Sequence, residues 1–267
     1  MVAKRNNKIE KVSKPYLKGD AFDRTTLSGA VKFFFGTVVM AVVFMIVCVM
    51  ISFDQTWLNI LVNTSVILAV YLMFAQLGMS SGANAVNQGE IMYTRQEKGR
   101  PVADWERSMC YHPMKGLLVA LLGSIPLVVC SAILACIAQR QMTSIGALPS
   151  WVSSIEGRPE IGNALAIYHE SASLTLETAL RILVRMSTMP YVNMVGAANK
   201  DGMLIIERIS PMLNLLPCLV YALGYMNGVS VRSAVHTNIA LGKKKAKRKQ
   251  IKERRARRQS RGPAQLN

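Results

Sequence analysis

The fold is decided by Phe33–Phe53, FFFGTVVMAVVFMIVCVMISF, a stretch of 21 residues without a charged side chain. A helix rises about 1.5 Å per residue, so this stretch is about 31 Å long and matches a hydrocarbon core of roughly 30 Å. We therefore predict a transmembrane helix here. Mostly polar residues precede it and it is too long for the apolar region of a signal peptide, so we expect an anchor that is not cleaved.

Three further uncharged stretches predict three further transmembrane helices. Trp57–Leu77 follows the first after a short turn, and Gly116–Ala138 is the third. The fourth, Ile209–Val231, contains Pro211 and Pro217, and we expect a kink at Pro217. The predicted fold class is an all-α integral membrane protein whose membrane domain, residues 29–231, has four spans.

The net charge of +17 lies mainly in one short segment near the C-terminus. Residues 243–261 carry twelve Lys and Arg against one Glu, which is +11 and leaves +6 for the rest of the chain. Half of the chain is hydrophobic, at 51%. The basic character therefore belongs to a polybasic tail, residues 232–267, and not to the body of the protein.

The basic residues of the other loops predict the orientation in the membrane. Lys and Arg are enriched in residues 1–32, in loop 89–115 and in the tail, whereas segment 139–202 has nearly balanced charge. Cytoplasmic flanks carry the excess of Lys and Arg. We predict that both termini, including the basic segment 1–28, and loop 89–115 are cytoplasmic, that segment 139–202 is external, and that the host is a bacterial-type plasma membrane. An odd number of spans would move the tail across the membrane, which argues against a fifth span at Leu174–Ala198.

The tail predicts an anionic partner. We expect its proximal residues to contact anionic lipid headgroups, because each Lys or Arg near such a surface contributes about 1 kcal/mol within a Debye length of about 8–10 Å. No Phe, Trp or Tyr follows Tyr225, so the stacking platforms of single-stranded nucleic-acid binders are missing. Docking on ribosomal RNA is the alternative. The predicted lipid contacts are Lys243, Lys244, Lys245, Lys247, Arg248 and Lys249.

Helical periodicity in Asn163–Met186 predicts an amphipathic helix in the external segment, with Glu177 and Arg181 as a surface pair. This helix is expected either to lie flat on the outer interface or to pack over the mouths of the spans. In a third arrangement, the polar side chains of this helix line a translocation path.

Two pairs of glycines four residues apart predict close helix contacts. Gly78 and Gly82 follow the second span, and Gly224 and Gly228 repeat the spacing in the fourth. Small residues at this spacing let helix backbones approach closely in lipid. The pairs are expected to pack on each other, on a second copy of the chain or on a partner protein.

The residues that attract a catalytic or metal interpretation lack the partners that such chemistry needs. Gly78–Gly82 has the form G-x-S-x-G, but a predicted membrane helix and not a strand precedes Ser80. The three histidines lie in separate segments, and Cys110 and His112 alone do not make a metal site. We expect no enzyme activity, no cofactor and no metal.

The sequence predicts a non-catalytic subunit or scaffold of a membrane complex, bound to lipids and to a protein partner or to itself. One alternative is a small transport component whose path uses Asn63, Thr64, Ser65, Asn214 and a kink at Pro217. Another is a ribosome-associated insertion factor that uses the tail. Polar span residues that face a shared cavity would favour transport, and polar residues that face a neighbouring helix would favour a scaffold.

Overall fold

The computed structural model describes residues 12–50, 53, 55–138, 176–196 and 199–260. Within these ranges the regular elements are helices, and four of them are long and apolar enough to cross a membrane. The predicted all-helical class with four candidate spans is confirmed. The helices are α1 (Arg24–Met50), α2 (Thr56–Glu97), α3 (Asp104–Ser108), α4 (Lys115–Ile137), α6 (Leu176–Ser187), α7 (Met189–Val195), α8 (Lys200–Met226) and α9 (Gly228–Ser260).

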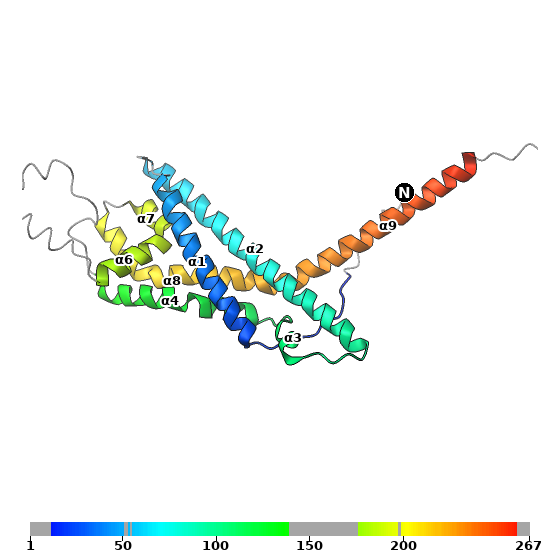
Figure 1. Cartoon of the computed structure of the whole chain (residues 1–267). Helices are drawn as coiled ribbons and strands as arrows, with labels where there is room; N and C mark the ends of the chain where they lie inside the picture. The colour runs from blue at the N-terminus through cyan, green and yellow to red at the C-terminus, as the bar shows by residue number, and fades with distance from the viewer. Residues whose placement is uncertain (1–11, 51–52, 54, 139–175, 197–198, 261–267) are drawn as a thin grey trace, which may run out of the picture.

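The long helices form a bundle around α8. Helix α8 packs between α4 and α2, and α1 packs across α4 (Figure 1). The core lies at this crossing, where the ring of Phe33 on α1 stands 5.1 Å from that of Tyr221 on α8 and 5.8 Å from that of Phe74 on α2. Helix α9 continues from the end of α8 and extends away from the bundle (Figure 1).

Two helices extend beyond the spans predicted from hydrophobicity. Helix α2 continues past Leu77 to Glu97, so the first part of the predicted loop 89–115 is helical. The helix stops just before Gly99, which has a φ of +70°. Helix α8 starts at Lys200 and runs through both prolines to Met226, and α9 begins two residues later at Gly228. Hydrophobicity marks the part of a helix that suits lipid, whereas turn residues mark where the helix ends.

An extended N-terminal segment, residues 12–23, ties one end of the bundle together. The amide of Leu17 donates to the carbonyl of Gly89 on α2 at 3.0 Å. The amide of Gly19 donates to the carbonyl of Tyr111 at 3.1 Å. The amide of Val12 donates to the hydroxyl of Thr237 on α9 at 3.1 Å. One segment therefore joins α2, the connection before α4, and α9.

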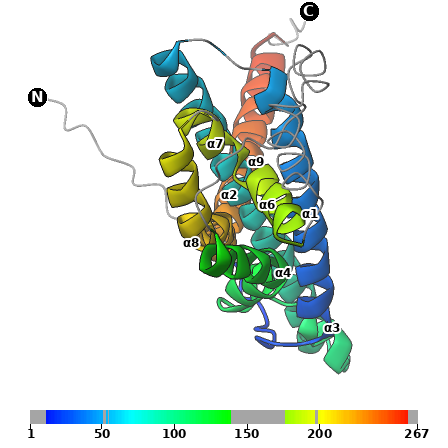
Figure 2. The same cartoon turned by 90° about the vertical axis from the view of Figure 1, so that its left-hand side faces the viewer.

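Helices α6 and α7 form a short hairpin packed against the spans at the other end of the bundle (Figure 2). Helix α6 contacts α1 and α4, and α7 contacts α2 and α1. Residues 163–175 of the predicted amphipathic helix lie outside the described residues, and its remainder is α6. The break at Thr188 divides Leu174–Ala198 into two short helices, and neither reaches the length of a span.

Candidate functional site

Helix α6 has its charged face turned inward. Arg181 is only 5% exposed, whereas Leu176 and Leu183 on the apolar face are 78% and 43% exposed. A helix on an aqueous surface has the opposite arrangement. Glu177 and Arg181 do pair, at 3.0 Å, but the sequence-based view of an exposed surface pair is wrong because the arginine is buried. The charged face of α6 therefore packs against the bundle, and its apolar face is exposed.

The inward face of α6 binds a buried carboxylate on α8. Glu207 is 2% exposed and accepts hydrogen bonds from Arg181 Nε at 3.1 Å and from Arg185 Nε at 3.0 Å. Glu177 adds a second negative charge on Arg181. Pairing of this kind is what makes burial of charges tolerable. Sequence reasoning missed this pairing. The available signal was the spacing of Arg181 and Arg185, four residues apart, together with Glu207 just before the fourth predicted span.

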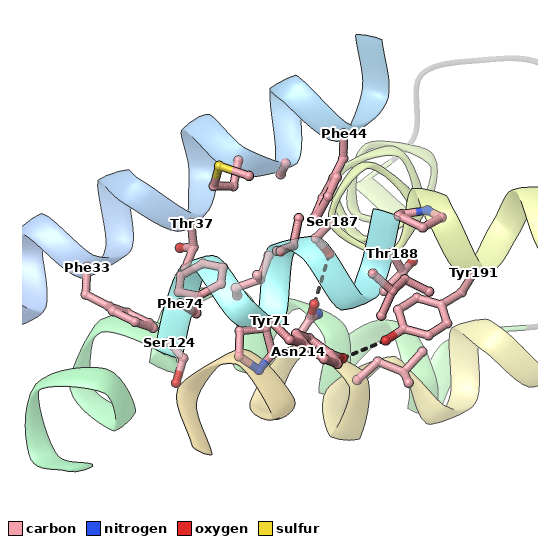
Figure 3. A pocket seen from close by; sticks show the side chains of 18 residues that line it. Phe33, Thr37, Phe44, Tyr71, Phe74, Ser124, Ser187, Thr188, Tyr191 and Asn214 are labelled. Atoms are coloured by element: carbon pink, nitrogen blue, oxygen red, sulfur yellow. Dashed lines mark hydrogen bonds between the residues drawn. The ribbon is translucent and has the colours of Figure 1, made fainter. Parts of the chain in front are cut away.

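A cavity of about 60 Å³ lies between the α6–α7 turn and the four long helices (Figure 3). The hydroxyls of Tyr71 on α2 and Tyr191 on α7 meet in it at 2.6 Å. Ser187 Oγ donates to Asn214 Oδ1 on α8 at 3.1 Å. Figure 3 shows these side chains pointing toward one another, and they come from α2, α6, α7 and α8. The described residues that line the cavity are uncharged.

Of the polar residues assigned to a translocation path, Asn63, Thr64 and Ser65 do not line this cavity. Asn63 is buried against α1, where Cys48 Sγ lies 3.6 Å from its Oδ1, and its Nδ2 donates to Asn59 O. Thr64 and Ser65 are exposed on the outside of α2, and each donates to a carbonyl of its own helix. Of this set, Asn214 lines the cavity.

The glycine pairs of α2 and α8 lie against each other. A Cβ at Gly78 would collide with the carbonyl oxygen of Tyr221, and a Cβ at Gly224 would collide with that of Ala75. A Cβ at Gly82 would come within 3.2 Å of Gly228 Cα, and one at Gly228 would collide with the backbone of Gly82. Backbones this close exclude any side chain between them. The contact is within one chain, between the second span and the junction of α8 and α9.

A second buried carboxylate fixes α9 to α2. Glu90 is 8% exposed; its Oε2 accepts from Arg232 Nη2 at 3.0 Å, and its Oε1 lies 2.7 Å from His236 Nε2. His236 was the one histidine that a serine hydrolase interpretation could have used. It is engaged with Glu90, and Ser80 is exposed on α2. Sequence reasoning missed Glu90 because the helix continues beyond the apolar stretch.

After the contact with Glu90, α9 continues with basic residues that are exposed. The predicted lipid contacts are all exposed, and residues 242–250 have no buried member. They are Lys243, Lys244, Lys245, Lys247, Arg248 and Lys249.

The residues around Cys110 are packing groups. Cys110 is fully buried, and burial raises the pKa of its thiol, although Lys115 and Arg107 act against this. Tyr111 stacks on Tyr225 of α8 with ring centroids 5.4 Å apart. Lys115 donates to the Thr25 hydroxyl at 2.8 Å and to the Ser108 carbonyl, and it is buried. A lysine at the end of a span commonly extends to the lipid headgroups, but Lys115 does not. Within the described ranges no group of His, Cys, Asp or Glu could hold a metal ion.

These features define a multi-pass, all-helical membrane protein with a polar interior and a protruding basic helix. Comparisons with protein-family models, with curated proteins and with solved structures find no match to this chain.

Proposed function

We propose that this protein is a non-catalytic scaffold or subunit of a membrane complex, which holds α9 in a fixed direction and presents its basic residues to an anionic partner in the cytoplasm. The observation that carries this proposal is the attachment of α9. Its first turns are fixed to α2 by Glu90 and to the N-terminal segment by Thr237. Its later turns, from Gly242 onward, are exposed.

The helical form of the tail favours a partner that reaches beyond the lipid surface. Lys243 follows Val231, the end of the predicted fourth span, by twelve residues, which corresponds to about 18 Å of helix. This exceeds the Debye length of about 8–10 Å over which surface charge acts. An α9 that leaves the membrane steeply offers its charges to a cytoplasmic polyanion, and one that lies flat offers them to headgroups. Helix α9 thus also favours a second candidate, the ribosome-associated insertion factor.

The experiment compares both partners under the same conditions. The full chain in nanodiscs of neutral lipid is mixed with acidic liposomes or with ribosomes, and co-sedimentation is measured against salt. The scaffold proposal predicts binding to acidic liposomes that is released at roughly 0.5 M salt, because screening shortens with ionic strength. Replacing the six proximal basic residues with Gln should abolish it. Ribosome binding that resists this salt, without liposome binding, would favour the insertion factor instead.

The alternative of a small transport component has less support than the scaffold. Asn63 faces a neighbouring helix, and Thr64 and Ser65 face outward. By the criterion of a shared cavity, these three residues favour a scaffold, and Asn214, which lines the cavity, favours transport.

The proposed orientation is tested by single-cysteine labelling. In a background without native cysteines, Cys at Gln55, in the turn between α1 and α2, is expected to react with a membrane-impermeant maleimide on intact cells. Cys at Lys252 on α9 is expected to react only after the cells are opened. Both positions are exposed, so the reagent can reach them wherever the membrane permits. Labelling of Lys252→Cys on intact cells would contradict the proposed cytoplasmic tail.

A further inference from the structure

The central cavity contains one polar group without a partner. Asn214 is 8% exposed, its Oδ1 accepts from Ser187, and its Nδ2 has no hydrogen-bond partner among the described residues. A buried donor left unpaired costs about 1–3 kcal/mol. An acceptor placed in the cavity would remove this cost.

Most of the other polar groups around the cavity are already engaged. One of the two tyrosine hydroxyls donates to the other, which leaves one tyrosine O–H for a further acceptor. The Thr37 hydroxyl donates to Phe34 O at 2.7 Å, and the Thr188 hydroxyl donates to Val184 O at 2.9 Å. The Ser124 hydroxyl donates to Leu121 O. The Asn214 amide and one tyrosine O–H are therefore the donors left in the cavity, and together they call for an uncharged acceptor.

The position of Asn214 along α8 and the volume of the cavity limit which acceptor can bind. Asn214 lies fourteen residues after the start of α8, which is about 21 Å along a 27-residue helix, so a charged headgroup at this depth is disfavoured. For comparison, an engineered apolar cavity that binds benzene has a volume of about 150 Å³. At about 60 Å³ this cavity is too small for a ring but has room for a linear carbonyl.

An apolar groove lies next to the cavity. The groove, of about 400 Å³, runs between α1, α4 and α6, and Thr37, Ala41, Leu127 and Ser187 line both the cavity and the groove. Its outer walls include Val42 and Leu183, which are 39% and 43% exposed. The cavity with the Asn214 amide and the apolar groove are thus adjacent, with four side chains in common.

We propose that this site binds an uncharged acyl lipid, with an ester carbonyl accepting from the Asn214 amide and the acyl chain lying in the groove between α1, α4 and α6. An acyl chain gains little by leaving lipid for an apolar groove, because the two surroundings are equally apolar. The amide hydrogen bond and the size of the cavity therefore decide which lipid is retained. This site is separate from α9 and does not depend on the scaffold function.

The test uses the full chain purified in mild detergent and offered dioleoylglycerol, phosphatidylglycerol and a prenyl quinone in equal amounts. After gel filtration, retained lipids are extracted and quantified by mass spectrometry. Stoichiometric retention of dioleoylglycerol with exclusion of the other two is the expected result. Equal retention of phosphatidylglycerol would overturn the uncharged head, retention of the quinone alone would overturn the size limit, and retention of none would overturn the site.

Two variants separate the polar end from the groove. Asn214→Leu removes the donor and should lower retention about tenfold, which corresponds to about 1.4 kcal/mol. Ala179→Trp fills the groove from α6 without touching the cavity and should lower retention as strongly. Leu72→Phe, at an exposed position of α2 outside both linings, is the control and should retain the lipid. Unchanged retention in Ala179→Trp would refute the proposal even if Asn214→Leu failed to fold.

Discussion

Glu207→Gln is expected to lower the free energy of unfolding by about 3–5 kcal/mol, the usual cost of removing one partner of a buried ion pair. The substitution leaves Arg181 and Arg185 facing an uncharged amide in a nearly water-free site, where Glu207 is 2% exposed. The melting temperature in detergent should fall on the order of 10 °C. The measurement is a thermal melt of the purified chain.

Glu177→Gln is the matched control for Glu207→Gln. Glu177 also pairs with Arg181, but its side chain is 41% exposed, and pairs of this kind contribute at most about 1 kcal/mol. The double variant Glu207→Gln/Arg185→Gln should regain part of the lost stability because it removes one of the two arginines that face the new amide. Equal losses from the two single Glu variants would show that the burial of Glu207 does not matter.

Gly82→Leu and Gly228→Leu are expected to destabilise the bundle at or above the upper end of the 1–3 kcal/mol typical of overpacking. The collisions are with backbone atoms of Tyr225 and Gly82, which cannot change rotamer to make room. The variants should still insert, since Leu favours the membrane. Membrane-fraction yield together with a thermal melt separates the two effects.

Gly36→Leu is the control for the glycine contacts. No atom lies within 4 Å of a Cβ placed at Gly36, so the same substitution there should change the melting temperature little. Ser80→Ala tests the remaining hydrolase motif and should also be nearly silent, because Ser80 is exposed on α2. Leu variants at Gly82 and Gly228 that melt like the unchanged chain would refute the close-contact interpretation.

The four spans could be predicted because a long uncharged stretch has few alternatives to a membrane helix. Their ends could not, because Leu77 to Glu97 continues a helix after the apolar signal has stopped. The four glycines were identified from their spacing alone. Which surface they meet depends on how α2 crosses α8, and sequence spacing does not specify this crossing.

The charged interior was missed for a related reason. Arg181 was assigned to the exposed face because charged residues on an amphipathic helix normally meet water. Its partner, Glu207, lies 26 positions later on another helix. Pairings this distant in sequence follow from the tertiary fold, and so do the cavity at Asn214 and the Glu90 contact with Arg232.

The inward arginines of α6 also constrain the order in which the chain is assembled during synthesis. When α6 leaves the ribosome, the helix that carries Glu207 has not yet been made, and a 12-residue helix bearing two arginines is poorly stable in hydrocarbon. The α6–α7 hairpin is therefore expected to wait outside the bilayer until α8 has inserted. Entry of the hairpin then becomes the last step of membrane integration, and it is coupled to completion of the fourth span.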